Sequence, residues 1–99
     1  SGTGPAYVFY TMEGMIQSGT EMGMSLEMAE RLVLHTVFGA AKLAMESDLD
    51  PTALREAVTS RGGTTDTAIS HLEEHGYTRL VVEAILAAMG RSEELGRGR

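Results

Sequence analysis

The chain has 99 residues, enough for one domain with a modest core, so a folding partner is expected to add stability. It carries 14 acidic and 8 basic side chains, and the net charge of -6 argues against nucleic acid or an anionic membrane surface as a partner. It has no cysteine, which excludes disulfides and thiolate metal sites, and it has no secretory leader pattern or bilayer-length apolar run, so we expect a cytoplasmic protein outside the membrane.

The first half of the chain contains the signals of two long helices. Gly4-Pro5 favours a helix over 5–22, since proline in the first turn loses no needed N–H group. Gly23 should end that helix in a left-handed conformation. Ser25 should then cap a second helix from Leu26 to about Glu46.

The second half contains three further predicted helices. Asp50-Pro51 repeats the cap-then-proline signal and predicts a short helix over 51–58. A fourth helix should start at Thr64 or Thr65 and reach Glu74 or His75, where Gly76 interrupts it. A fifth should run from Tyr77 to about Glu94, and residues 96–99 should form a frayed tail. No alternating pattern supports a strand, so the prediction is an all-α bundle of four to five helices.

The first two predicted helices are apolar on more than one face. A helix that is apolar nearly all round must be buried nearly all round. A chain of this size cannot cover two such helices by itself, so we expect an obligate oligomer whose interface resembles a divided core.

The stretch TSRGGTTDTA over 59–68 is the sharpest candidate site. Gly62 and Gly63 permit unusual backbone angles, and Thr64 and Thr65 open a helix whose free N–H groups and dipole favour an anion. The same residues also suit an ordinary turn and helix cap. Both interpretations stay open on this stretch alone.

The histidines offer weaker alternatives. His71 and His75 stand four apart on one helix face, a spacing that can hold zinc, but a solvated helix end is the commoner explanation and we predict no metal site. A hydrolase triad of Ser60, His71 and Asp66 is set aside, because no nucleophile elbow GxSxG is present.

Three segments together resemble the C-terminal helical domain of the pyrroline-5-carboxylate reductase family. They are SGTGPAYVFY at the start, VFGAAKLA over 37–44, and VTSRGGTTDTAISHLEEHG over 58–76, in the family's order and spacing, and the resemblance runs over residues 1–95. It implies an interlocked homodimer that can assemble into higher oligomers. The family's nucleotide-binding half has no counterpart here, because no GxGxxG follows a strand.

The resemblance also implies roles for individual residues. The parent enzymes reduce pyrroline-5-carboxylate to proline with NADPH or NADH, in proline biosynthesis. The substrate carboxylate would lie on the loop and amides of Gly62, Gly63, Thr64 and Thr65, supported by Ser60. The Thr65 hydroxyl would act on the imine nitrogen, and Val58 would face the nicotinamide.

Three expectations follow from the missing half. The 99 residues should start within a longer protein, should bind no nicotinamide cofactor alone and should be inactive alone.

The family commonly has proline where this chain has Arg61, which either contacts an anion or points to solvent. The alternative to a reductase domain is a protein of another functional class, a free-standing helical association module with no small-molecule ligand.

Overall fold

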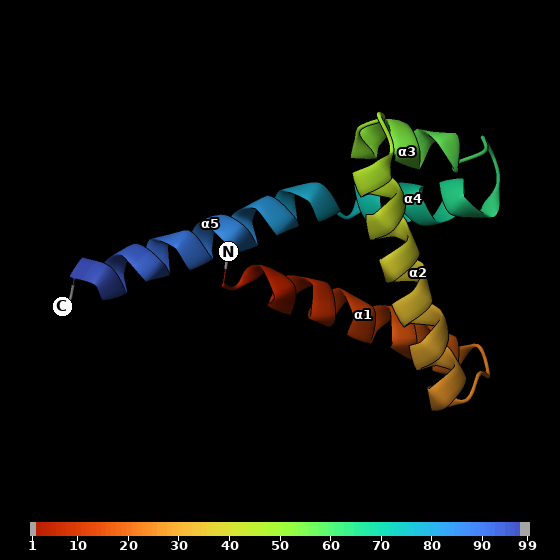
Figure 1. Ribbon diagram of the computed structural model, residues 1–99, viewed down its shortest axis with the longest axis horizontal. Helices are drawn as coiled ribbons and strands as arrows, with labels where there is room; N and C mark the ends of the chain where they lie inside the picture. The colour runs from red at the N-terminus through yellow and green to blue at the C-terminus, as the bar shows by residue number, and fades with distance from the viewer. Residues whose placement is uncertain (1, 98–99) are drawn as a thin grey trace. The chain divides into compact units, whose positions relative to one another are not determined.

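The computed structural model describes residues 2–97 and contains five helices within them (Figure 1). They are α1 Gly4–Glu21, α2 Leu26–Glu46, α3 Pro51–Ala57, α4 Thr64–Glu74 and α5 Tyr77–Arg97. No strand is present between residues 2 and 97, and the predicted all-α class is confirmed.

The predicted helix signals act through the expected hydrogen bonds. The Ser25 hydroxyl accepts the Met28 N–H at 3.2 Å at the start of α2, and the Asp50 carboxylate accepts the Ala53 N–H at 2.8 Å at the start of α3. Gly23 and Gly76 have φ values of 101° and 70° in the turns after α1 and α4. These positions favour glycine because other residues resist positive φ.

The last helix is longer than predicted. The sequence suggested an end near Glu94, but α5 continues to Arg97, so Gly96 and Arg97 are helical where a frayed tail was expected. One exposed ion pair spans the extra residues, with Arg97 Nη1 and Glu93 Oε2 4.0 Å apart. The rest of the expected tail, residues 98–99, lies outside the described residues.

The chain divides into two compact units, of which the first covers residues 1–54. Within it, α1 and α2 meet close to the turn that joins them (Figure 1). The apolar core of this unit consists of Ala29, which is 1% exposed, and Val33, which is 7% exposed. Gly19 is buried at the same crossing, and a Cβ atom on it would lie 2.9 Å from the Ala29 Cβ. The two helices therefore approach closely only because Gly19 has no side chain.

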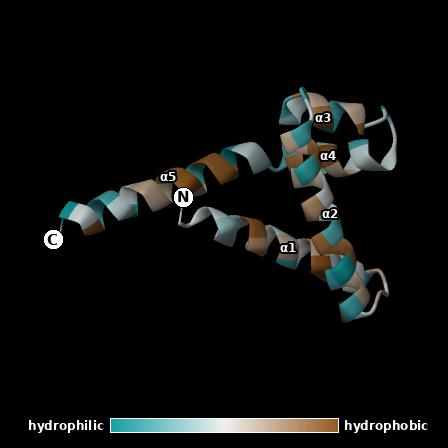
Figure 2. Cartoon of the chain, viewed as in Figure 1, coloured by the Kyte–Doolittle hydropathy of each residue, from teal (hydrophilic) through white to brown (hydrophobic). Residues whose placement is uncertain are grey.

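The second unit covers residues 55–99 and contains α4 and α5. These helices are joined by the turn at Gly76 and contact each other. None of the described residues of α4 and α5 is buried. The first half of α5 is apolar and its end is hydrophilic (Figure 2). Unit two thus presents an apolar helix surface instead of enclosing a core.

Large apolar side chains are exposed on the long helices of both units. Large apolar residues of α1, α2 and α5 that are more than half exposed include Phe9, Tyr10, Leu34, Phe38, Met45 and Leu80. Within residues 2–97, no helix combines the length and the apolar character needed to cross a bilayer.

Candidate functional site

The candidate site is the loop between α3 and α4, followed by the first turn of α4. Val58 lies in the turn that follows α3 and is 66% exposed. Ser60, Thr64 and Thr65 are also exposed, whereas Gly63 is half-buried. The predicted site residues therefore form one contiguous stretch, made of this loop and the first turn of α4.

Hydrogen bonds fix the shape of this loop. The Gly62 N–H donates to Asp66 Oδ2 at 2.9 Å, and the Gly63 N–H donates to the Ser60 carbonyl oxygen at 2.9 Å. On the other side, the backbone N–H and the hydroxyl of Thr67 both donate to the Gly63 carbonyl oxygen at 3.1 Å. Asp66 stands at the third helical position and accepts from the amide one residue before the N-cap Gly63, whereas the acid of a capping box accepts from the N-cap amide itself.

The free donors of the loop are the first amides of α4. The N–H groups of Thr64, Thr65 and Asp66 have no acceptor among residues 2–97, as expected for the first turn of a helix. They point along the helix axis, where the helix dipole favours negative charge. The Gly63 amide, which the sequence placed among the anion ligands, is instead used by Ser60 in this structure. Two adjacent amides with two hydroxyls beside them can hold a carboxylate.

The two glycines serve different purposes. Gly62 has a φ of 77°, so it occupies the left-handed region that other residues avoid. Gly63 has a φ of -86° and a ψ of -176°, which any residue can adopt, so the expectation of an unusual backbone angle there is wrong. The space at this position is tight, because a Cβ on Gly63 would lie 3.2 Å from the Ser60 carbonyl oxygen and the turn would have to shift by a few tenths of an ångström.

The charges near the free amides have opposite effects. The Asp66 carboxylate would repel an incoming anion, but one of its oxygens is neutralised in part by the Gly62 N–H. Arg61, in the turn beside Gly62, is exposed and supplies a positive charge on the same loop. The sequence did not predict the contact between Asp66 and Gly62; an acid at the third helical position signals only that its carboxylate reaches back toward the start of the helix.

A hydrolase triad receives no support from the side-chain geometry. Asp66 bonds to Gly62, and His71 lies beside His75 with ring centroids 4.4 Å apart, so no Asp66–His71 pair exists within residues 2–97 to complete a hydrolase triad. No group of three or more metal-ligating side chains gathers in the described part of the chain.

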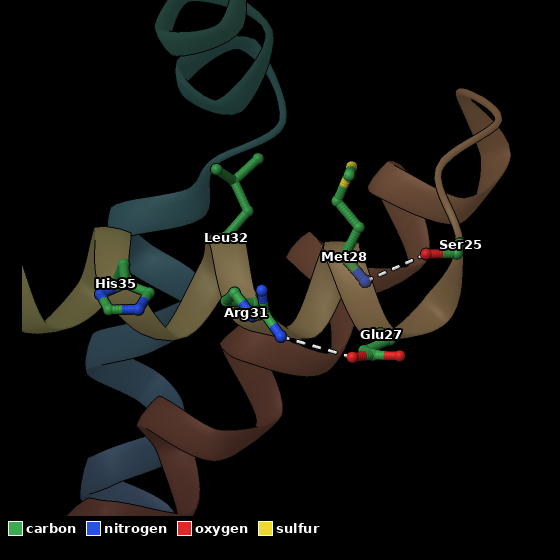
Figure 3. Close-up of a pocket in the computed structure, with 6 residues that line it drawn as sticks. All are labelled: Ser25, Glu27, Met28, Arg31, Leu32 and His35. Carbon is green, nitrogen blue, oxygen red and sulfur yellow. Dashed lines mark hydrogen bonds and ion pairs between the residues drawn. The ribbon is translucent and has the colours of Figure 1, made fainter.

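A separate hollow of about 510 Å³ follows one face of α2 (Figure 3). It is lined by Ser25, Glu27, Met28, Arg31, Leu32 and His35. The side chains of Met28 and Leu32 are more than half exposed and extend from the same side of α2, beside the 3.3 Å ion pair of Arg31 and Glu27. An open, mainly apolar helix face of this kind suits a partner helix better than a small polar ligand.

Known proteins match the chain over nearly all of its length. The family model for pyrroline-5-carboxylate reductase dimerisation matches residues 1–95. A pyrroline-5-carboxylate reductase of Pseudomonas aeruginosa is 46% identical over 95 residues, covering 96% of this chain and 35% of that protein. The corresponding protein of Synechocystis is 40% identical over 97 residues, covering 98% and 36%. The chain thus spans about a third of the length of the curated relatives it matches.

Solved structures match the fold equally well. The crystal structure of Plasmodium falciparum pyrroline carboxylate reductase with NADP bound has a TM-score of 0.90 at 35% identity, over 93% of this chain and 35% of that one. A pyrroline-5-carboxylate reductase of Coxiella burnetii has a TM-score of 0.90 at 42% identity, over 94% and 34%. These matches do not favour the alternative of a free-standing association module.

Proposed function

Because the chain belongs to the pyrroline-5-carboxylate reductase dimerisation family, we propose that it is the dimerising and substrate-binding domain of such a reductase. The reaction would be hydride transfer from NADPH or NADH to the cyclic imine of pyrroline-5-carboxylate, giving proline. A cytoplasmic location stays a prediction from composition.

One observation carries the dimerisation part of the proposal, namely that the helices expose their apolar residues. The core of the first unit consists of Ala29 and Val33, while Phe38 on the same helix α2 is 67% exposed. Burying one such side chain fully contributes about 1.5–3 kcal/mol. A second copy that covers α1, α2 and α5 would supply the core that each unit lacks. Further dimer contacts could build a higher oligomer.

The loop before α4 would hold the substrate carboxylate. The amides of Thr64 and Thr65 would bind its oxygens, while Gly62 and Gly63 shape the turn and Ser60 supports it. The Thr65 hydroxyl would hydrogen-bond the imine nitrogen and help to protonate it as hydride adds to the neighbouring carbon.

The nicotinamide cofactor would be held mainly by a nucleotide-binding domain. Val58, with its exposed isopropyl group, fits an apolar contact with a nicotinamide ring. The described residues offer no strand followed by a glycine-rich turn for the pyrophosphate, so the 99-residue chain alone should bind no cofactor and show no activity.

A chimera tests this function directly. Residues 1–95 would replace the matched segment of the Pseudomonas aeruginosa relative, which keeps its own remaining two-thirds. We expect a dimer that oxidises NADPH or NADH only when pyrroline-5-carboxylate is present. A folded, dimeric chimera without this activity would contradict the proposal, and the unmodified relative is the positive control.

A further inference from the structure

Two histidines on the last turn of α4 lie outside the loop described above. His71 and His75 are four residues apart, which places their side chains on one face of the helix. Their ring centroids are 4.4 Å apart, with an angle of 36° between the ring planes. Both residues are exposed, so the two imidazoles are presented side by side.

A hydrogen bond sets the tautomer of one ring. His75 Nδ1 lies 2.8 Å from the His71 carbonyl oxygen. A carbonyl oxygen can only accept, so Nδ1 of a neutral His75 carries the proton and Nε2 keeps its lone pair. Histidines that bind metals commonly donate their other N–H to a backbone carbonyl in this way, which orients the ring and raises its basicity. The contact fixes the His75 ring and leaves Nε2 as the atom that would bind a metal ion.

The electrostatic surroundings also favour a cation. The pair lies at the C-terminal end of α4, which is the negative end of the helix dipole. Glu73 and Glu74 stand between the two histidines in sequence and add two carboxylates to the same turn. The opposite end of α4 carries the free amides of Thr64 and Thr65, so anion and cation preferences are separated along one helix.

We propose that His71 and His75 form a binding site for one divalent transition-metal ion of the kind that prefers imidazole, such as zinc. The two Nε2 atoms would be ligands, and water would fill the remaining positions. The spacing His-x-x-Glu-His also occurs in one class of zinc peptidases. Since no group of three ligating side chains exists among residues 2–97, the site assigned here binds metal and has no hydrolytic role.

Zinc titration of the complete 99-residue chain, prepared without an affinity tag, tests this site. Calorimetry with zinc chloride should show one ion per chain. The zinc affinity should fall about tenfold or more in His71→Gln and in His75→Gln. Once one histidine holds the ion, the other histidine is kept close to it and binds at a high effective concentration, and each variant loses this advantage. His35→Gln, which removes the exposed histidine on α2, is the matched control and should keep the parent affinity.

A second measurement identifies the ligands themselves. Zinc should shift the imidazole NMR signals of His71 and His75 and leave those of His35 in place. Circular dichroism would verify that each variant keeps the helical content of the parent. The proposal is overturned if the folded double variant His71→Gln, His75→Gln binds zinc as the parent does, or if the parent binds none. This outcome is independent of the reductase proposal, which the chimera tests.

Discussion

Thr65 presents two groups that can act on one substrate, a free backbone N–H and a side-chain hydroxyl. In the chimera, Thr65→Val should lower kcat/KM for pyrroline-5-carboxylate about a hundredfold, since a positioned proton donor contributes that order of rate. The substitution keeps the backbone N–H, so dimer mass should not change. Steady-state kinetics with varied imine substrate measures the effect.

Two further variants separate the hydroxyl of Thr65 from its shape. Thr65→Ser keeps the hydroxyl and should recover most of the lost rate. Ser70→Ala removes an exposed hydroxyl further along α4, outside the candidate site, and should keep the parent rate. If Thr65→Val reduces the imine as fast as the parent, its hydroxyl has no part in the reaction.

Asp66 shapes the loop through its bond to the Gly62 N–H at 2.9 Å. Asp66→Ala removes the acceptor, so the Gly62 amide should exchange with solvent faster, and the free energy of unfolding should fall by about 1 kcal/mol. Hydrogen exchange and urea unfolding of the chain, at fixed protomer concentration, measure both effects. Asp66→Asn keeps an acceptor oxygen and should lose less. Unchanged exchange at Gly62 in Asp66→Ala would show that this bond does not hold the loop.

At the scale of the helix, the crossing of α1 and α2 depends on one missing methyl group. Gly19→Ala would place a Cβ 2.9 Å from the Ala29 Cβ, closer than such atoms normally approach. The helices must then shift, and the free energy of unfolding should fall by about 1–3 kcal/mol in urea titration.

The same helix offers a matched control. Gly14 also lies within α1, but a Cβ there would meet no atom within 4 Å. Gly14→Ala should therefore stabilise the chain by up to about 1 kcal/mol, because alanine favours the helix over glycine. Adding Ala29→Gly to Gly19→Ala should recover part of the loss. Equal effects of Gly14→Ala and Gly19→Ala would mean that helix propensity, and not the crossing, determines both.

The ends of the helices were predictable from sequence where one side-chain hydrogen bond or one turn residue determines the end. Ser25 and Asp50 cap their helices through their own side chains, and Gly76 provides the positive φ of its turn. The end of α5 was missed because a helix end depends on a balance of small effects, here helix propagation and the exposed Arg97–Glu93 pair against the cost of Gly96. Local patterns contain no such balance of small effects.

The site was predictable only as a contiguous stretch. The glycines and threonines predicted free amides at the start of α4, and the structure has them at Thr64 and Thr65. The use of the Gly63 amide by Ser60 depends on the path of the turn, which the residue types do not specify. The roles of the site residues in binding a substrate stay predictions.

At the scale of the whole molecule, the apolar surface exceeds what two small units can bury. The described helices of unit two bury no residue, and the apolar core of unit one consists of two side chains. Folding must still offset about 1–2 kcal/mol of backbone entropy per ordered residue. We therefore expect folding and association of this chain to occur together, with an unfolding temperature that rises with protein concentration.

Phe38 on α2 provides the test of that coupling, because its side chain is 67% exposed in the single chain. Light scattering should give the parent a mass of twice 10.6 kDa, and Phe38→Glu should dissociate it. Each Phe side chain contributes about 1.5–3 kcal/mol, and a twofold interface contains two, so the dissociation constant should rise roughly 10²–10⁴-fold.

Ser92→Glu adds the same charge to the hydrophilic end of α5 and should leave the dimer intact. A Phe38→Glu chain that stays dimeric at the parent's concentration would exclude this face of α2 from the interface, and a folded parent monomer would remove the basis for obligate association.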